Sequence, residues 1–453
     1  MRTLLLDAAE RAARYLEELD DRSVAPTPEA VACLATLEQP LPDGPTDPAE
    51  MLAELDAIGS PATMAMAGRR FFGFVIGGAL PATVAANWLA TAWDQNSSLV
   101  AVTPGTAKLE DIAIGWLLDI LRLPPQSGVG FVTAATTANF SALLAARHQV
   151  LAHAGWDVEA DGMFGAPPIT VVVSEEAHTT LFKSLGMAGF GRNRVVKVPV
   201  DGQGRMRADQ FPAISGPTIV CLQAGNVNTG AFDPAGAIIP RAKAAGAWVH
   251  VDGAFGLWAA AAPARRHLLE GFDGADSWAT DAHKWLNTPY DSGLVFVRDP
   301  EALRAAMAVT AAYLPTGAQR DPSSYTPELS RRARGVEVWA ALRTLGRSGL
   351  ADLIERTCRY ATRFAERLSA AGYTILNDVI LNQVLVSFGD AETTQRVITA
   401  IQEDGTCWCG ITRWQGHTAM RISVSSWATT EEDVDRSIEA MLRAARQQGA
   451  YPA

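Results

Sequence analysis

Residues 277–285 read SWATDAHKW, and they follow the shorter segment HVDGA at residues 250–254. Asp252 ends one β-rich run, and Lys284, which lies 32 residues further on, follows another. In a parallel sheet the carboxyl ends of the strands meet at one edge, where ligands bind. We therefore expect the Asp252 carboxylate and the Lys284 amine to project into the same cleft.

The surrounding chain repeats the alternation of strand and helix. Between about residues 128 and 300, short β-rich runs are separated by helix-like stretches at 178–188 and 235–246. This pattern is typical of βαβ units, and it predicts an α/β fold with a mainly parallel central sheet and helices on both faces. The expected strands are 169–173, 194–200, 218–222, 248–252 and 293–297.

The two ends of the chain have different patterns. Residues 3–19 form an amphipathic helical stripe, and a proline-rich linker follows it. After residue 338 come a long helical region to about 371, strands at 383–388 and 420–424, and helices near 391–404 and from about 430. Apolar and polar residues alternate in Met420–Val424, as in a sheet with one solvated face. We expect a helical arm with its linker at 1–70, a large domain at 71–337 and a small α+β domain at 338–453.

Composition excludes several classes of protein. Hydrophobic residues make up 48% of the chain and charged residues 19%, which is a globular composition. The net charge of −11 and the absence of a basic run argue against nucleic acid as a partner. Five scattered cysteines and an apolar start too short for a signal peptide predict a reduced, cytoplasmic protein. The uncharged run from Phe71 to Trp93 contains glycines and a proline, so we expect buried or cleft-lining chain and no membrane span.

A lysine amine and a buried carboxylate are the two groups that a pyridoxal phosphate (PLP) enzyme needs, one for a Schiff base and one for the pyridinium proton. Taken alone, Asp252 could be an ordinary aspartate at a strand end, and Lys284 an ordinary surface lysine. Together, HVDGA and DAHKW resemble the group II PLP-dependent amino acid decarboxylases, relatives of the aromatic-L-amino-acid and glutamate decarboxylases. The resemblance covers nearly the whole chain, and it implies the aspartate-aminotransferase-like fold type I with residues 71–337 as the PLP-binding domain.

The resemblance also implies roles for single residues. Lys284 would form the Schiff base with PLP, Asp252 would face the pyridine nitrogen, and Ala254 would pack against the ring. Asp281 and His283 would belong to the cofactor site, with His283 reaching the phosphate. His178 matches the histidine that stacks on the outer face of the ring and can hold the substrate carboxylate or assist proton transfer, although a histidine at a strand end is often a helix-start or core residue.

Two loops match cofactor loops of the family with departures. Small residues at 128–139 lead into a helix-like stretch, which suits a phosphate at a helix N-terminus, with Ala135 and Thr136 as the contacts. The family has more glycine and serine here, and an acidic residue at the position of Thr137. In the turn at 224–233, Val227 stands where relatives have a threonine near the ring hydroxyl. Asn226 or Asn228 could replace that contact, or the segment could be a plain polar turn.

The substrate side is less well defined. Residues 316–332 match the loop that carries a catalytic tyrosine, and they offer Tyr325 as the acid, with Tyr313 as second choice, or else a plain exposed loop tyrosine. Arg421 could meet a carboxylate or form a surface ion pair. Cys407 and Cys409 have no further metal-ligand residues near them in the sequence, so we expect no metal site. An aromatic cluster could line a pocket for an aromatic or large apolar substrate, or could be core: Phe71, Phe72, Phe74 and Trp93.

The resemblance implies decarboxylation of an L-amino acid to an amine and carbon dioxide, through an external aldimine and a quinonoid intermediate. Retro-aldol cleavage or oxidative deamination on the same scaffold is an alternative, and so is a PLP-binding protein without catalysis. A homodimer with the active site at the interface is expected, with the N-terminal helix against its partner.

Overall fold

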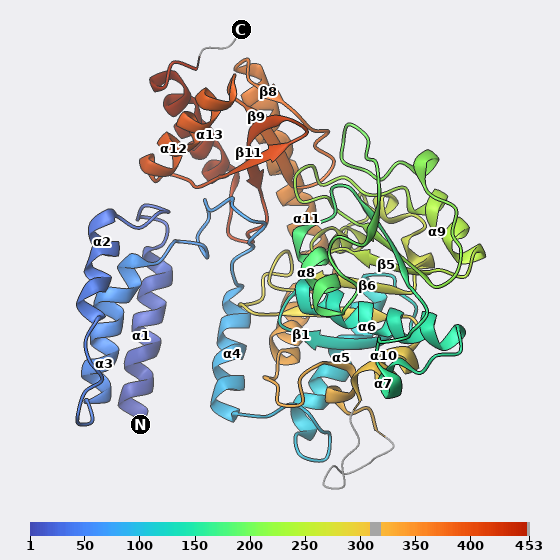
Figure 1. Cartoon of the computed structure of the whole chain (residues 1–453). Coiled ribbons are helices and arrows are strands. Elements are labelled where there is room, and N and C mark those ends of the chain that lie inside the picture. Colours follow the sequence, from blue (N-terminus) through green and yellow to red (C-terminus); the bar gives the residue numbers. More distant parts are fainter. Residues whose placement is uncertain (309–318, 451–453) are drawn as a thin grey trace. The chain divides into compact units, whose positions relative to one another are not determined.

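The computed structural model describes residues 1–308 and 319–450 (Figure 1). Their contacts divide the chain into two compact units. The large unit consists of Ala79–Cys358 and Asn377–Gln383, and the small unit of Met1–Gly78, Arg359–Leu376 and Val384–Ala453. These units group the first 78 residues with the C-terminal elements, whereas the domains at 1–70, 71–337 and 338–453 remain a prediction.

The large unit is built on a seven-stranded sheet in the order β1-β7-β6-β5-β4-β2-β3. The pairs from β3 to β6 are parallel, which confirms the mainly parallel sheet, whereas β7 runs antiparallel to both β6 and β1. Residues 282–292 join β6 to β7 without a helix, whereas a parallel return usually needs a crossover helix. The strands are β1 (Gly128–Val132), β2 (Thr170–Ser174), β3 (Val195–Val198), β4 (Thr218–Gln223), β5 (Trp248–Asp252), β6 (Ser277–Asp281) and β7 (Gly293–Val297).

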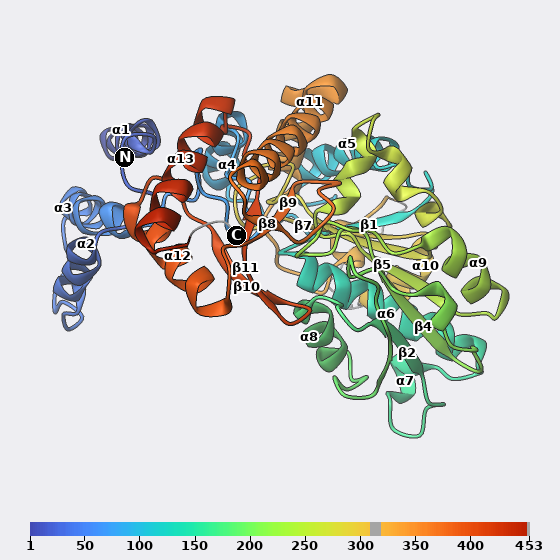
Figure 2. The same cartoon turned by 90° about the horizontal axis from the view of Figure 1, so that it is seen from above.

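Helices cover both faces of this sheet, with α6 and α8 on one face and α5 on the other (Figure 2). Helix α6 lies close to the strands because its inward positions are small, with Ala138, Ala142 and Ala146 fully buried. The helices of this unit are α4 (Pro81–Trp93), α5 (Pro104–Ile120), α6 (Ala135–His153), α7 (Val158–Asp161), α8 (Thr179–Met187), α9 (Ala235–Ala244), α10 (Pro300–Met307) and the first part of α11 (Gly335–Ala370).

The small unit joins both ends of the chain. Its four-stranded sheet has the order β10-β11-β9-β8, with antiparallel hairpins β10–β11 and β8–β9. Buried Arg70 holds the N-terminal segment to the C-terminal elements, because it binds the carbonyl oxygens of Asp20 and Thr406 and the carboxylate of Asp433. Its elements are α1 (Arg2–Glu18), α2 (Pro28–Cys33), α3 (Pro48–Glu54), β8 (Thr374–Ile375), β9 (Gln383–Ser387), α12 (Ala391–Asp404), β10 (Gly410–Trp414), β11 (His417–Ser423) and α13 (Glu431–Gln447).

The uncharged run from Phe71 to Trp93 is not one continuous helix. Its first part is irregular chain, and only Pro81–Trp93 is helical. Pro81 is the first residue of α4, a position that favours proline. Within the described residues, the structure has no helix with the length and apolar character that crossing a bilayer requires.

Candidate active site

Lys284 lies directly after β6 and is paired with the aspartate that ends this strand. Its Nζ is 2.8 Å from Oδ2 of Asp281, and 19% of the lysine side chain is exposed, compared with 3% of the aspartate. Strand β5, which ends at Asp252, is the parallel neighbour of β6, and Asp252 lies opposite Ala279. The two chemical segments therefore share one edge of the sheet, as their spacing predicts.

Asp281 also binds the start of helix α6. Its Oδ1 accepts a hydrogen bond of 2.5 Å from the backbone N–H of Ala135, the first residue of a helix whose N-cap, Ala134, has no capping side chain. Gly293 permits this approach, because a Cβ there would lie 2.5 Å from the carbonyl carbon of Ala134. The amide of Ala135, which we expected to contact a phosphate, is thus bound by Asp281, and the helix presents Thr136 and Thr137 as its next two residues.

His283 lies beside this carboxylate, with Nε2 3.7 Å from Oδ1 of Asp281. Its Nδ1 accepts a hydrogen bond from the backbone N–H of Ser292, and burial lowers its pKa below the ordinary value. The ring is therefore neutral at pH 7 with its proton on Nε2, which can donate to an anion. Tyr290, which sequence reasoning missed, stacks on this ring at a centroid distance of 4.3 Å. Tyr290 is 56% exposed, yet partial desolvation and the charge of Asp281 raise its pKa to about 12, so its hydroxyl remains a donor.

Asp252 is 5% exposed and accepts one hydrogen bond at each carboxylate oxygen. Oδ1 accepts from the backbone N–H of Ala254 at 3.2 Å, and Oδ2 accepts from Nδ2 of Asn139 at 3.0 Å. The carbonyl oxygen of Ala254 in turn accepts from the N–H of Asp281 at 2.9 Å, which ties the two chemical segments together. Across residues 1–308 and 319–450, no lysine or arginine pairs with Asp252.

Asn139, which sequence reasoning also missed, is fully buried on α6. It shares a helix face with Ala142 and Ala146, at spacings of three and seven residues. A buried side-chain amide on an otherwise alanine face needs hydrogen-bond partners. An asparagine on the alanine face of the predicted helix was therefore the sequence signal that could have identified Asn139.

The remaining predicted cofactor residues of the large unit have local partners. His178 is the N-cap of α8, where its Nδ1 accepts from the N–H of Thr180, so the helix-start alternative holds for its backbone. Asn226 is 1% exposed and closes its own turn, because its Oδ1 accepts from the N–H of Asn228 and its Nδ2 donates to Glu176. The plain-turn alternative therefore explains Asn226, and Asn228 supplies backbone to the same turn.

Tyr325 lies on a short turn within the predicted loop region, and its side chain is not fully exposed. It ends a short 3-10 helix, Pro322–Tyr325, and its partly buried ring packs against the core beside Gly128, at the start of β1. The guanidinium of Arg320 lies 4.4 Å from the ring centroid. The alternative of a plain exposed tyrosine is therefore wrong, because apolar packing and a cation–π contact hold this side chain. Tyr313 lies outside the described residues.

The aromatic run divides into core and surface. Phe71 is 2% exposed and stacks on Trp408 at 5.1 Å, and Phe72 is 1% exposed with its edge against Phe364. Both belong to the interior of the small unit, so core packing explains them. Phe74 is 60% exposed, and Trp93, in the large unit, is 45% exposed. Arg421 lies half-buried on β11, where burial lowers its pKa.

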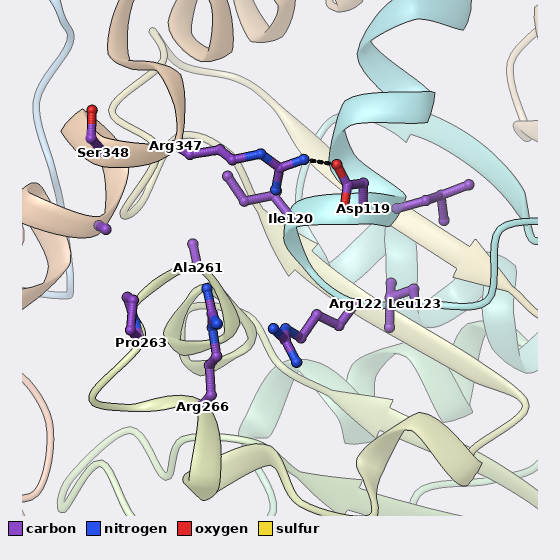
Figure 3. A pocket seen from close by; sticks show the side chains of 11 residues that line it. Asp119, Ile120, Arg122, Leu123, Ala261, Pro263, Arg266, Arg347 and Ser348 are labelled. Carbon is purple, nitrogen blue, oxygen red and sulfur yellow. Dashed lines mark hydrogen bonds and ion pairs between the residues drawn. The ribbon is translucent and has the colours of Figure 1, made fainter.

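One pocket of the large unit, of about 570 Å³, lies between the end of α5, the 261–266 segment and the 347–351 turn of α11 (Figure 3). Arg122 and Arg266 both line it, and Arg347 is paired with Asp119. Its lining includes neither Lys284 nor Asp252. We therefore do not assign the predicted chemistry to this pocket.

Curated relatives of this chain act on different amino acids. Tryptophan decarboxylase 1 from Oryza sativa subsp. japonica is 29% identical over 322 residues, which cover 65% of this chain and 62% of that protein. L-2,4-diaminobutyrate decarboxylase from Rhizobium meliloti (strain 1021) is 29% identical over 444 residues, 90% of this chain and 84% of that protein. 4-hydroxyphenylacetaldehyde synthase from Rhodiola rosea is 26% identical over 360 residues, 74% and 72% respectively. The match thus spans less than two thirds of the tryptophan decarboxylase.

A solved structure shares the fold, and a family description matches most of the chain. The crystal structure of Oryza sativa TDC with PLP and tryptamine has a TM-score of 0.91 and 22% identity to this chain, and the comparison covers 98% of this chain and 97% of that one. The likeness shows the fold type I architecture. The family described as the pyridoxal-dependent decarboxylase conserved domain matches residues 33–389. Because this match covers most of the sequence, the chain belongs to the pyridoxal-dependent decarboxylases.

Proposed function

We propose that this protein is a PLP-dependent amino acid decarboxylase whose cofactor binds at the β5–β6 edge of the sheet. One observation carries the proposal: the Lys284 amine and the buried Asp252 carboxylate end adjacent parallel strands beside the N-terminus of α6. The amine can bind the cofactor aldehyde, the carboxylate can face the pyridinium nitrogen, and the helix N-terminus can bind the phosphate.

The unsatisfied groups of the site support this assignment. Asp252 is buried with two N–H donors and no cationic partner in the described part of the chain, and a buried carboxylate is costly without an opposite charge. The protonated pyridine nitrogen of PLP would supply that charge. Ser292 Oγ, next to the backbone amide that binds His283, is buried and lacks a hydrogen-bond partner among the described residues. A bound polar group would satisfy it.

Each residue then has a defined task. Lys284 would hold the cofactor aldehyde covalently, Ala254 would pack against the ring, and His283 would donate from Nε2 to the phosphate. Asp281 would release the Lys284 amine when the cofactor binds, and it would keep the start of α6 in place. When bound, PLP supplies an electron sink for the pair of electrons that a bond at the substrate Cα leaves behind.

Proton transfer would fall to His178 and Tyr325. The Nδ1 atom of His178 is engaged by its own helix, so in the neutral ring the proton is on Nε2, which could face the cofactor and the substrate carboxylate. Tyr325 remains a proposed proton donor from the sequence match. Thr136 and Asn228 remain proposed contacts of the phosphate and of the ring hydroxyl.

For the substrate we propose an aromatic or large apolar L-amino acid. Phe74 and Trp93 are exposed aromatic side chains, and several relatives are aromatic amino acid decarboxylases. Arg421 is the proposed contact for a carboxylate. We also propose a homodimer, because α1 buries none of its residues, and Leu5, Leu6 and Leu16 on it are exposed in the single chain. A cytoplasmic location is proposed from the five scattered cysteines.

Oxidative deamination is the second candidate function, because several relatives are aldehyde synthases. To separate the two, the purified protein with PLP would be incubated with single amino acids while carbon dioxide, amine, aldehyde and oxygen are measured together. We expect carbon dioxide and amine in equal amounts with no oxygen uptake. Aldehyde formed with oxygen consumption would favour the second candidate. Aldehyde from cleavage without carbon dioxide would indicate a carbon–carbon lyase, and no turnover with bound PLP would indicate a binding protein.

A further inference from the structure

Behind Asp252 lies a continuous chain of buried hydrogen bonds, which we name the Asp252 relay. Asn139 Nδ2 is 3.0 Å from Oδ2 of Asp252, and Asn139 Oδ1 is 2.9 Å from Nε2 of His250. The Nδ1 atom of His250 is 2.9 Å from Ser277 Oγ, which is also 2.9 Å from Nε1 of Trp248. Asn139, His250 and Ser277 are fully buried, and Trp248 and Asp252 are each 5% exposed.

The two ends fix the direction of every bond in the relay. The Asp252 carboxylate only accepts, so Asn139 presents Nδ2 to Asp252 and Oδ1 to His250. A neutral His250 therefore carries its proton on Nε2, donates it to Asn139 Oδ1, and accepts at Nδ1 from the Ser277 hydroxyl. At the other end the Trp248 indole only donates, so Ser277 Oγ also accepts from Trp248. One arrangement of hydrogens therefore satisfies all five side chains.

A neutral His250 is required for this arrangement. If the ring were protonated, both nitrogens would donate, so Nδ1 could no longer accept from Ser277, and the Ser277 hydroxyl hydrogen would have no acceptor in the relay. Burial lowers the pKa of His250 to about 4, against the opposing attraction of the Asp252 charge, so the ring is neutral at pH 7. The relay thus brings an N–H to Asp252 without bringing a positive charge.

We infer that Asn139 and His250 are positioning residues that fix the Asp252 carboxylate for the pyridine nitrogen of the cofactor. This inference rests on the proposed role of Asp252. The relay holds Oδ2 from the α6 side, and the Ala254 amide holds Oδ1 from the chain after β5. Rotation of the carboxylate would break both bonds. Because the relay contains no cation, the cofactor nitrogen is left as the positive partner.

The test compares four variants by three readouts. Asn139→Leu removes the bonds of Asn139 to Asp252 and His250, and Ser277→Ala removes the bonds of Ser277 to His250 and Trp248 with little change of shape. Asp252→Asn removes the proposed anion. Thr218→Val is the control, because Thr218 is equally buried on β4 and its hydroxyl donates to the carbonyl of Gly216, outside the relay. The readouts are the dissociation constant of PLP, the visible circular dichroism of the bound cofactor, which reports ring orientation, and kcat and KM separately.

We expect Asn139→Leu to weaken PLP binding by about 10–100-fold, the range that follows from an unsatisfied buried polar group, and to lower kcat more than it raises KM. Ser277→Ala should act in the same direction but less, and Thr218→Val should not change the readouts. Unfolding of each apoprotein shows whether it folds, and Ser277→Ala carries the test if Asn139→Leu does not.

Two outcomes overturn different claims. If Asp252→Asn weakens PLP binding while Asn139→Leu and Ser277→Ala match Thr218→Val, the relay does not position Asp252. If Asp252→Asn itself binds PLP like the unmodified protein, with an unchanged circular dichroism band, the role of Asp252 is wrong and the inference falls with it.

Discussion

Gly293 is the residue where a single added methyl group should disturb the proposed phosphate site most. It opens β7 directly beside Ala134, the residue before α6. A Cβ at this position would lie 2.5 Å from the carbonyl carbon of Ala134, 2.6 Å from its Cα and 2.9 Å from its nitrogen. All three contacts are to backbone, so no side-chain rotation relieves them, and the start of α6 must move.

The magnitude follows from overpacking. Forcing a methyl group into closely packed structure costs about 1–3 kcal/mol, and each 1.4 kcal/mol is tenfold in an equilibrium constant. We expect Gly293→Ala to lower the free energy of unfolding by about this amount. Because the displaced segment carries the Ala135–Asp281 hydrogen bond, PLP affinity should fall by about 5–100-fold.

The assay is urea unfolding of the apoprotein followed by PLP titration monitored by absorbance. Gly236→Ala is the matched control, because Gly236 lies in α9, where an added methyl group would meet no atom of the described residues within 4 Å. This control should be neutral or stabilising by up to about 1 kcal/mol, the usual gain for alanine over glycine in a helix. A Gly293→Ala protein with unchanged stability and PLP affinity would refute the close approach as the feature that shapes the phosphate site.

Three other predictions test the core and the buried histidine. Arg70→Met should destabilise the protein by about 3–5 kcal/mol in urea unfolding, because it leaves buried Asp433 without its cation, whereas Arg396→Met, at an exposed pair, should cost under about 0.5 kcal/mol. Phe71→Ala should cost about 3–5 kcal/mol and Phe74→Ala under about 1 kcal/mol by the same assay, and equal costs would contradict the division into core and surface. His250 should stay neutral in an NMR titration down to about pH 5, because its pKa is lowered to about 4. The stability that neutral His250 contributes is present above its ordinary pKa of 6.5 and is lost as the pH falls toward 4. Asp233 has the opposite sign, because burial raises its pKa to about 6, so its contribution is lost as the pH rises through 6.

The sequence predicted the features that depend on local pattern. The alternation of strands and helices identified the sheet, and HVDGA and DAHKW identified the two segments that meet at its edge. The antiparallel β7 was not predictable from its composition, because a buried strand reads alike in either direction. The direction goes with a return from β6 that contains no crossover helix, which parallel neighbours usually need.

The site residues that were missed depend on packing between distant segments. Asn139 lies 113 residues before its partner Asp252. Tyr290 is placed on His283 by the return into β7. The expected pocket wall at Phe71 and Phe72 became core for the same reason, since their partners Trp408 and Phe364 lie about 300 residues away in the chain.

The most direct test of the central claim is to locate the cofactor on the chain. The protein loaded with PLP would be reduced with borohydride, which makes the Schiff-base bond permanent, and the digested peptides would be mapped by mass spectrometry. The sequence has five lysines, at 108, 183, 197, 243 and 284, so the assignment is unambiguous. We predict the pyridoxyl group on Lys284 and its loss in Lys284→Ala. A pyridoxyl group on another lysine, or an unlabelled Lys284 in protein that binds PLP, would contradict the account.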